Sequence, residues 1–375
     1  MSKIIVLGAG MVGSAMAIDL SNKHEVTITD YSEQVLQNVS QKAPQLDTQI
    51  LDVTQIAHLK SSIADYDLVI CAVPGFLGFE TLKHIIQAKK NVVDISFFPE
   101  DALELNELAK EMGVTAVVDC GVAPGMGNII LGYYNEKLKL SDFECLVGGL
   151  PKQKKWPFCY KAPFSPVDVI EEYTRPARYV ENSNIIVREA LTDCEYVEFD
   201  KVGTLESFNS DGLRSIIKTM PHIPNMKEKT LRYPGHVEYI KVLKSSGFFS
   251  ETPVNIKGKE ISPLEFTSAI LFDEWKLGPT EEELTVMRIS LKGTDEDGNE
   301  QSVVYNLHDE YDPKTQTSSM ARTTGYTATA VANLFLEGIF TEKGVFPPEL
   351  IGKYENVFEY VMNYLKERNI TYTLS

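Results

Sequence analysis

Cysteine, tryptophan and long apolar runs are scarce in this sequence. It has five cysteines and two tryptophans among 375 residues, and no two cysteines have the Cys-x-x-Cys spacing. Scattered cysteines of odd number are typical of free thiols in a reducing compartment, so we expect a cytoplasmic protein. No run of eighteen apolar residues occurs, so we expect no membrane-spanning segment. The apolar run at residues 4–7 is too short for a secretory signal.

Basic residues are also in deficit. The 36 lysines and arginines are outnumbered by 53 aspartates and glutamates, which gives a formal net charge of −17. Nucleic acids and anionic membranes bind positive surfaces, so neither is expected as a main partner. No cluster of His and Cys has metal-ligand spacing, and we therefore expect no metal. The hydrophobic content of 43% supports folded cores, and the length favours two domains.

The first 120 or so residues alternate short apolar segments with amphipathic ones. The pattern predicts strands at residues 4–7, 26–29, 49–51, 68–71, 92–95 and 116–118. It predicts helices at residues 11–20, 32–40, 54–63, 79–88 and 101–111, with Ser32 and Thr54 as caps of the second and third. Strands that alternate with crossover helices form a parallel sheet covered on both faces. We therefore expect a doubly wound α/β fold.

The second half of the chain has a different pattern. Segments 285–292 and 302–308 flank the pair Asp297-Gly298, which predicts an antiparallel hairpin whose turn uses the positive φ angles of that pair. Helical periodicity returns at residues 328–337 and 351–368.

A glycine-rich loop follows the first predicted strand and opens the first predicted helix. It consists of Gly8, Ala9, Gly10, Met11, Val12 and Gly13. In a G-x-G-x-x-G loop the first glycine makes the tight turn, the second lets a pyrophosphate approach the backbone, and the third lets helix and strand pack closely. This strand–turn–helix context predicts a Rossmann dinucleotide site rather than a purely structural turn.

Asp30 ends the second predicted strand, seventeen residues after Gly13. An acid at this place accepts hydrogen bonds from the adenosine ribose and repels a 2′-phosphate. The next residues, Tyr31, Ser32 and Glu33, include no arginine for that phosphate. We therefore expect NAD to be preferred, with NADP less favoured.

Ligands of parallel sheets bind at the carboxyl ends of the strands. After the third strand, the residues expected to flank the adenine are Asp52 and Val53. After the fourth strand, those expected beside the nicotinamide ribose are Ala72, Val73 and Pro74. Those expected to face the nicotinamide and the substrate are Ser96, Phe97, Asp119 and Cys120.

A second glycine-rich loop, at residues 121–126, enters a helix predicted at 127–137. With several other segments it resembles the saccharopine dehydrogenase-like family, which includes lysine 6-dehydrogenases. The segments that carry the resemblance are residues 8–13, 92–96, 119–126, 230–236, 320–326 and 343–349. They lie in the family's order across nearly the whole chain.

The resemblance implies three parts: a Rossmann domain at residues 1–122, a substrate-binding and dimerisation domain at 123–320, and C-terminal helices at 321–375 that pack back on the first. The second domain should be α/β with a mixed, largely antiparallel sheet. The implied partners are a small amino-acid substrate and a second copy in a homodimer. The chemistry implied is oxidation of a carbon–nitrogen bond in an amino acid, or its reverse. The sequence 97–100, Phe-Phe-Pro-Glu, differs from the Gly- and His-rich segment of lysine 6-dehydrogenases, which argues against free lysine.

Amine oxidation requires a base near the nitrogen. Asp119 is a candidate for this base or for a ligand of the substrate ammonium; alternatively it caps a turn. His236 is a candidate because histidine titrates near neutrality, although a structural role is equally compatible with the sequence. Cys120 is a further candidate, as a proton donor, but a small buried filler explains it more simply.

Four residues are candidates for binding the substrate. Arg232 is suited to pair with a carboxylate, or with an acid of the protein itself. Arg322 precedes a predicted helix start and either completes an anion pocket or belongs to a plain helix cap. Asn209 and Asp211 lie in a predicted turn that would reach the substrate ammonium, the alternative being a turn without function.

Three functions fit these patterns. The first is an NAD-dependent amino-acid dehydrogenase acting on a C–N bond, of saccharopine or lysine 6-dehydrogenase type. The second is the reductive condensation of an amine with an aldehyde, as in carboxynorspermidine synthesis. The third is a protein that binds the dinucleotide without turnover.

Overall fold

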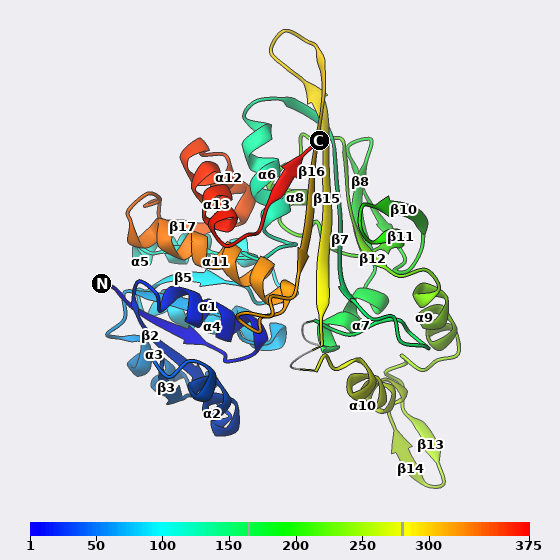
Figure 1. The fold of residues 1–375 in the computed structure, drawn as a ribbon, viewed down its shortest axis with the longest axis horizontal. Helices are drawn as coiled ribbons and strands as arrows, with labels where there is room; N and C mark the ends of the chain where they lie inside the picture. The colour runs from blue at the N-terminus through cyan, green and yellow to red at the C-terminus, as the bar shows by residue number, and fades with distance from the viewer. Residues whose placement is uncertain (164–165, 279–280) are drawn as a thin grey trace. The chain divides into compact units, whose positions relative to one another are not determined.

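The computed structural model describes residues 1–163, 166–278 and 281–375, and these divide into two units (Figure 1). Unit 1 comprises residues 1–139, 294–299 and 320–371, and unit 2 comprises residues 140–293, 300–319 and 372–375. Unit 1 extends beyond the expected boundary at residue 122, because the helix α6 (Met126–Asn135) packs against α12 (Pro348–Gly352) of the same unit.

The centre of unit 1 is a seven-stranded sheet in the order β17-β6-β5-β4-β1-β2-β3. Every neighbouring pair is parallel. The strands are β1 (Lys3–Leu7), β2 (Glu25–Asp30), β3 (Asp47–Ile50), β4 (Leu68–Cys71), β5 (Asn91–Asp94), β6 (Thr115–Val117) and β17 (Gly344–Phe346). The central strands are continuously buried, as parallel strands covered on both faces should be.

Crossover helices connect these strands. They are α1 (Met11–Leu20), α2 (Glu33–Lys42), α3 (Ile56–Ile63), α4 (Gly75–Gln87) and α5 (Asn106–Met112), with a 3₁₀ turn at Ala102–Leu105 before the last. Ser32 caps α2, as predicted. Thr54 does not cap α3, because its hydroxyl donates to Asp52 and closes the turn before the helix.

Three C-terminal helices also belong to unit 1. They are α11 (Ser319–Leu336), α12 and α13 (Glu355–Glu367). The Asp19 carboxylate of α1 joins two of them, α11 and α13, because it accepts hydrogen bonds from Thr329 of α11 (2.6 Å), Tyr364 of α13 (2.6 Å) and Arg368 (2.7 Å). The helix predicted at 328–337 corresponds to α11, which begins nine residues earlier, at Ser319.

Unit 2 is built on a nine-stranded mixed sheet. Its main path runs β10-β11-β12-β7-β15-β16-β18, with β8 paired to β12 and β9 paired to β8. The strands are β7 (Lys139–Pro151), β8 (Ala177–Glu181), β9 (Asn184–Arg188), β10 (Glu195–Phe199), β11 (Gly203–Asn209), β12 (Asn225–Arg232), β15 (Glu283–Thr294), β16 (Glu300–Glu310) and β18 (Tyr372–Leu374). Its helices are α7 (Pro166–Thr174), α8 (Ile216–Thr219), α9 (His236–Ser245) and α10 (Pro263–Trp275). A separate small hairpin joins β13 (Val254–Ile256) to β14 (Lys259–Ile261).

The sheet is mixed because β12 pairs parallel with β7 and antiparallel with β8 and β11. The predicted hairpin is formed by β15 and β16, neighbours in this sheet. Of the pair Asp297-Gly298, only Gly298 has a positive φ angle, so the prediction of positive φ at both residues was wrong for Asp297. The predicted fold class, a Rossmann parallel sheet and a second domain with a mixed sheet, is confirmed.

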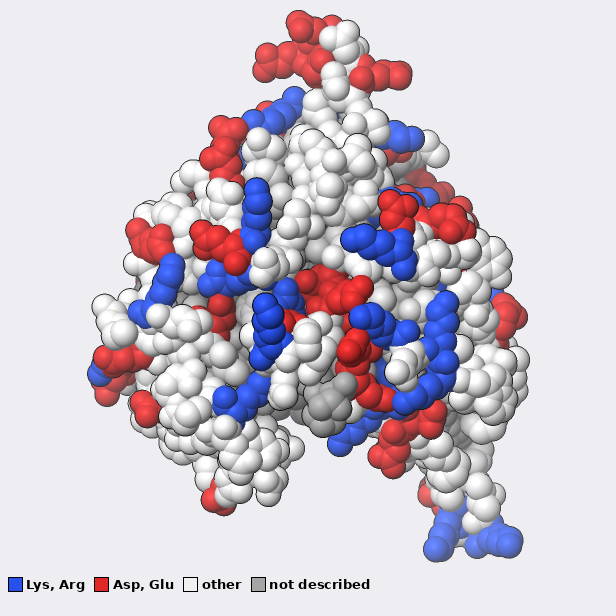
Figure 2. Space-filling view, in the orientation of Figure 1, with Lys and Arg blue, Asp and Glu red and all other residues white. Residues whose placement is uncertain are grey.

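The surface carries charges of both signs. On the face drawn in Figure 2, basic and acidic side chains both occur over most of the surface. No helix of the described residues is both long and apolar enough to cross a bilayer. Within the same ranges, no three His, Cys, Asp or Glu side chains gather as metal ligands would.

Candidate functional site

The glycine loop after β1 has three glycines with different surroundings. Gly8 has φ +103°, and a Cβ built on it would lie 2.4 Å from the Ala72 carbonyl oxygen. A Cβ on Gly13 would lie 2.0 Å from the carbonyl oxygen of Gly8. A Cβ on Gly10 would meet nothing within 4 Å. Gly8 and Gly13 are therefore required by packing, whereas Gly10 borders open space of the kind a pyrophosphate would occupy.

The helix α1 begins at this open space. Gly10 is its N-cap, no side chain caps it, and the first turn contains no acid. The loop thus presents backbone N–H groups and the positive end of the helix dipole to an anion. Met11 and Val12 belong to this first turn; Met11 is 44% exposed and Val12 is half-buried. The open space and the helix start together fit a dinucleotide pyrophosphate.

Asp30, at the end of β2, is bound to the protein backbone. Its carboxylate accepts the N–H of Ala9 at 3.0 Å and the N–H of Ser32 at 2.9 Å. One oxygen therefore fixes the glycine loop, and the other fixes the turn into α2. Beside it, Tyr31 is 80% exposed. The acid shapes the edge of the site through these two backbone contacts.

The next two strand ends lie along the same edge. Asp52 is half-buried and accepts hydrogen bonds from the hydroxyl and N–H of Thr54, which lower the pKa of its carboxyl. Val53 is half-buried against the core. After β4, the N–H of Ala72 donates to the Leu7 carbonyl, which aligns this loop with the glycine loop. Val73 is buried and Pro74 caps α4, so the segment is rigidly placed.

Asp94, the last residue of β5, is a site residue that the sequence analysis did not identify. It is fully buried, and one carboxylate oxygen accepts the N–H of Ser96 at 2.6 Å. Its other oxygen, Oδ2, has no hydrogen-bond partner among the described residues. Burial raises the pKa of the carboxyl to about 7, and the charge of Asp119 adds to the rise. The sequence signal for this residue is an aspartate that directly follows the apolar residues Val92 and Val93 of the strand.

Asp119 and Cys120 follow β6. Asp119 is 6% exposed and has φ +52°, and the N–H of Cys120 donates to the backbone carbonyl of Asp94. The two acids therefore lie at adjacent strand ends. Burial raises the pKa of the Cys120 thiol, and Asp119 and Asp94 add to this, so the thiol stays protonated at neutral pH. Phe97, between these segments, is half-buried, and its carbonyl packs on Gly75.

The second glycine loop leads into α6. Gly125 has φ +141°, and a Cβ there would lie 1.8 Å from the Gly121 carbonyl oxygen, so the loop tolerates only glycine. Its N–H donates to Asn128, whose amide in turn donates to the buried Glu349.

Arg322 was expected to precede a helix start, but it lies within α11, which already begins at Ser319. The Arg322 side chain is buried and donates to the carbonyl of Arg368 at 3.0 Å. This contact fits a structural role in holding the C-terminal segment of unit 1 better than an exposed anion pocket.

His236 is buried in unit 2, within an aromatic group that includes Tyr160, Tyr173 and Trp275. Its Nδ1 lies 2.9 Å from the Phe158 carbonyl and its Nε2 lies 2.9 Å from the Tyr173 hydroxyl. Burial, with the nearby charge of Arg232, lowers its pKa to about 3. Both ring nitrogens are thus engaged and the ring stays neutral, which favours the structural role over acid–base chemistry.

Arg232 is also committed within unit 2. Its guanidinium pairs with Glu172 at 2.7 Å, donates to the Tyr173 hydroxyl, and lies over the Tyr160 ring at 4.4 Å. The side chain is 2% exposed. The alternative of an internal ion pair, rather than a substrate carboxylate, fits these contacts.

Asn209 and Asp211 have partners of their own. The Asn209 amide oxygen accepts from Tyr179, and its nitrogen donates to Thr192 and Asp193. Asp211 accepts a bidentate pair of hydrogen bonds from Arg178. Both side chains stabilise the edge of the unit 2 sheet, and neither offers an uncommitted group to a substrate ammonium.

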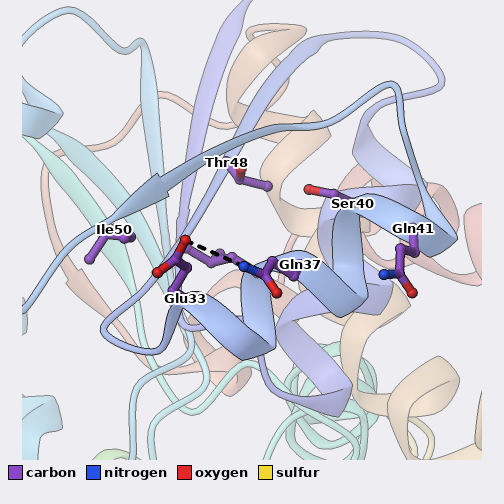
Figure 3. A pocket seen from close by; sticks show the side chains of 7 residues that line it. Glu33, Gln37, Ser40, Gln41, Thr48 and Ile50 are labelled. Carbon is purple, nitrogen blue, oxygen red and sulfur yellow. Dashed lines mark hydrogen bonds between the residues drawn. The ribbon is translucent and has the colours of Figure 1, made fainter.

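A polar groove of about 630 Å³ lies between α2 and β3 (Figure 3). Its lining residues are Glu33, Leu36, Gln37, Ser40, Gln41, Thr48 and Ile50. None of the predicted site residues lines it.

The open space at Gly10, the start of α1 and the acids at the neighbouring strand ends fit a Rossmann-type dinucleotide site. The chain belongs to the saccharopine dehydrogenase family. Residues 4–117 match the saccharopine dehydrogenase NADP binding domain, and residues 121–370 match the saccharopine dehydrogenase C-terminal domain.

Several known proteins are similar to this chain. A carboxyaminopropylagmatine dehydrogenase of Synechocystis is 22% identical over 93% of this chain and 92% of its own length. A saccharopine dehydrogenase [NADP(+), L-glutamate-forming] of Pyricularia oryzae is 28% identical over 54% of this chain and 47% of its own. The matched part is thus about half of that relative's length. For a rat alpha-aminoadipic semialdehyde synthase, the matched part is 21% of the relative's length. The apo saccharopine dehydrogenase (L-Glu forming) of Saccharomyces cerevisiae has the same fold, with a TM-score of 0.81, 20% identity, and coverage of 100% and 99%.

These comparisons correct the expected cofactor. The matched domain is described as NADP-binding, and the Pyricularia and Saccharomyces relatives are named for NADP(+). The preference for NAD over NADP was therefore wrong. Its premise fails because Asp30 bonds to the N–H groups of Ala9 and Ser32, so its presence does not reserve this edge for an unphosphorylated ribose.

Proposed function

We propose that this protein is an NADP(H)-dependent dehydrogenase acting on the secondary amine of an amino-acid conjugate, of the saccharopine type. The observation that carries the proposal is the open space at Gly10, bounded by the start of α1 and set in a fold shared with saccharopine dehydrogenase. The family membership supports a C–N bond as the site of oxidation.

The bound dinucleotide would supply the hydride acceptor. The chain's own residues would perform two tasks. The backbone at Gly10 and the first turn of α1 would hold the pyrophosphate. Asp119, which follows β6, would accept the proton from the substrate nitrogen as the C–H hydride leaves. The resulting imine adds water and separates into an amine and a carbonyl compound.

The reverse direction, reductive condensation of an amine with an aldehyde, is the second candidate. It is favoured by the relative of Synechocystis, a carboxyaminopropylagmatine dehydrogenase matched along 92% of its length. The saccharopine dehydrogenases are matched over a smaller share, 47% in Pyricularia. The two candidates would use the same site and differ in the direction of the reaction and in the amine that is released or consumed.

The test is nicotinamide absorbance with the full-length protein. NADP⁺ is offered with saccharopine and with carboxyaminopropylagmatine, and NADPH is offered with the matching amine and carbonyl pairs. We expect one set to change the absorbance, and we expect Asp119→Asn to lower kcat by about 10²–10⁴-fold, the range for loss of an acid–base group. Tight NADPH binding without turnover on any pair would instead favour a binding protein.

A further inference from the structure

The strand ends of unit 1 hold a second acid beside Asp119. Asp94 ends β5, Asp119 follows β6, and the Cys120 N–H donates to the Asp94 carbonyl at 3.1 Å. On the other side, Asp94 is in register with Cys71 of β4. The carboxyl of Asp94 is therefore enclosed between two neighbouring strands at the edge where the dinucleotide site lies.

The surroundings of Asp94 do not neutralise a negative charge. One oxygen accepts the N–H of Ser96 at 2.6 Å, and Oδ2 has no hydrogen-bond partner in the described part of the chain. The Cys71 thiol and the Ser96 hydroxyl lower the pKa of this carboxyl, but the burial that raises it is the larger effect. The titratable groups against it are the thiols of Cys71 and Cys120 and the carboxyl of Asp119. In the described ranges Asp94 also forms no ion pair. A fully buried carboxyl in such a place is expected to be protonated when its neighbour is ionised.

We propose that Asp94 is a positioning residue that acts through Asp119: the two carboxyls are electrostatically coupled, and Asp94 stays neutral so that Asp119 carries the single negative charge of the pair. When Asp119 takes the proton of the substrate nitrogen, the repulsion on Asp94 falls. The pKa of Asp94 then falls as well, because the two carboxyls titrate as a coupled pair. This inference rests on the proposed function for its catalytic meaning, but the coupling itself exists without substrate.

The experiment is an infrared pH titration of the complete protein without substrate. A buried protonated carboxyl gives a C=O band distinct from that of the ionised carboxylates. We expect the wild-type band to disappear with a midpoint near the pKa of about 7 given by burial. Asp94→Asn should lack it. Asp119→Asn should retain it with a lower midpoint, because the neighbouring charge is gone.

Asp19→Asn is the matched control, since Asp19 is a buried acid of the same unit whose carboxylate has three hydrogen-bond donors. This variant should keep the Asp94 band. The proposal is overturned if the wild type has no such band at pH 6, if Asp94→Asn retains it, or if Asp119→Asn leaves the midpoint unchanged. The comparison of wild type with Asp119→Asn decides the question even if Asp94→Asn does not fold.

A kinetic measurement tests the catalytic meaning separately. With an active substrate pair, the pH profile of kcat should contain an ionisation near 7 that Asp94→Asn loses, whereas a purely structural role would lower kcat equally at every pH. A confirmed infrared titration together with absent turnover would reject the proposed function and retain the coupling. Turnover without a coupled infrared band would support the proposed function and reject the coupling.

Discussion

Asp94→Asn should increase the stability of the protein relative to wild type, and this gain should grow as the pH rises. The carboxyl has its pKa raised from 3.8 to about 7 by burial. Between these values the folded protein binds a proton that the unfolded chain has released. Raising the pH through this window therefore lowers the stability of the wild type. The amide introduced by the substitution is neutral, has about the same size as the carboxyl, and has no such penalty.

The magnitude follows from the size of the shift. A displacement of about three pKa units corresponds to about 4 kcal/mol when complete, at 1.36 kcal/mol per unit. About 2.5 kcal/mol of it should appear between pH 5 and pH 8. Chemical denaturation of both proteins at several pH values measures the difference in unfolding free energy. A difference that does not change with pH, or that favours the wild type more at pH 8, would refute the assignment of a neutral buried Asp94.

Three further predictions concern unit 1 and unit 2. Gly13→Ala should strongly lower the melting temperature, because its Cβ would lie 2.0 Å from the Gly8 carbonyl oxygen, and unchanged melting would contradict the packing described. Arg368→Met should lower the unfolding free energy by about 3 kcal/mol, because it leaves the buried Asp19 carboxylate without its cation, and denaturation measures this. His236 has its pKa lowered to about 3, so the unfolded chain binds more protons between pH 3 and 6.5, and stability is lost as the pH falls through this window. His236→Phe should remove about 5 kcal/mol of that acid-dependent loss, and an unchanged dependence of stability on acid pH would count against the buried neutral ring.

The first half of the fold could be predicted from the sequence because its signals are local. Continuous apolar strands, the glycine loop and the Ser32 cap each depend on residues that are neighbours in the chain. The strand β17 was missed, since it has only three residues and gains its order by pairing with β6, more than two hundred positions earlier. The start of α11 was missed for a related reason, because Thr323 and Thr324 interrupt the helical pattern and are held by packing on unit 1.

The candidate site divides in the same way. The loop residues from Gly8 to Gly13 were identified because each glycine has a role that a motif defines. Asp94 was overlooked because its burial depends on strands β4 and β6. The contacts of His236 and Arg232 with Tyr173 join residues about sixty positions apart, and these contacts change the expected roles of both side chains. The cofactor preference failed because backbone donors that no motif specifies take up the carboxylate of Asp30.

The central claim is that the start of α1 holds a nicotinamide dinucleotide at Gly10, and calorimetric titration with NADPH tests it most directly. Wild type should bind NADPH, whereas Gly10→Ala should keep the wild-type melting temperature and lose affinity by about tenfold or more, about 1.4 kcal/mol. A Cβ at Gly10 has no neighbour within 4 Å, so the added side chain occupies only the ligand's space. Equal affinity of the two proteins for NADPH, or no binding by the wild type, would contradict the account.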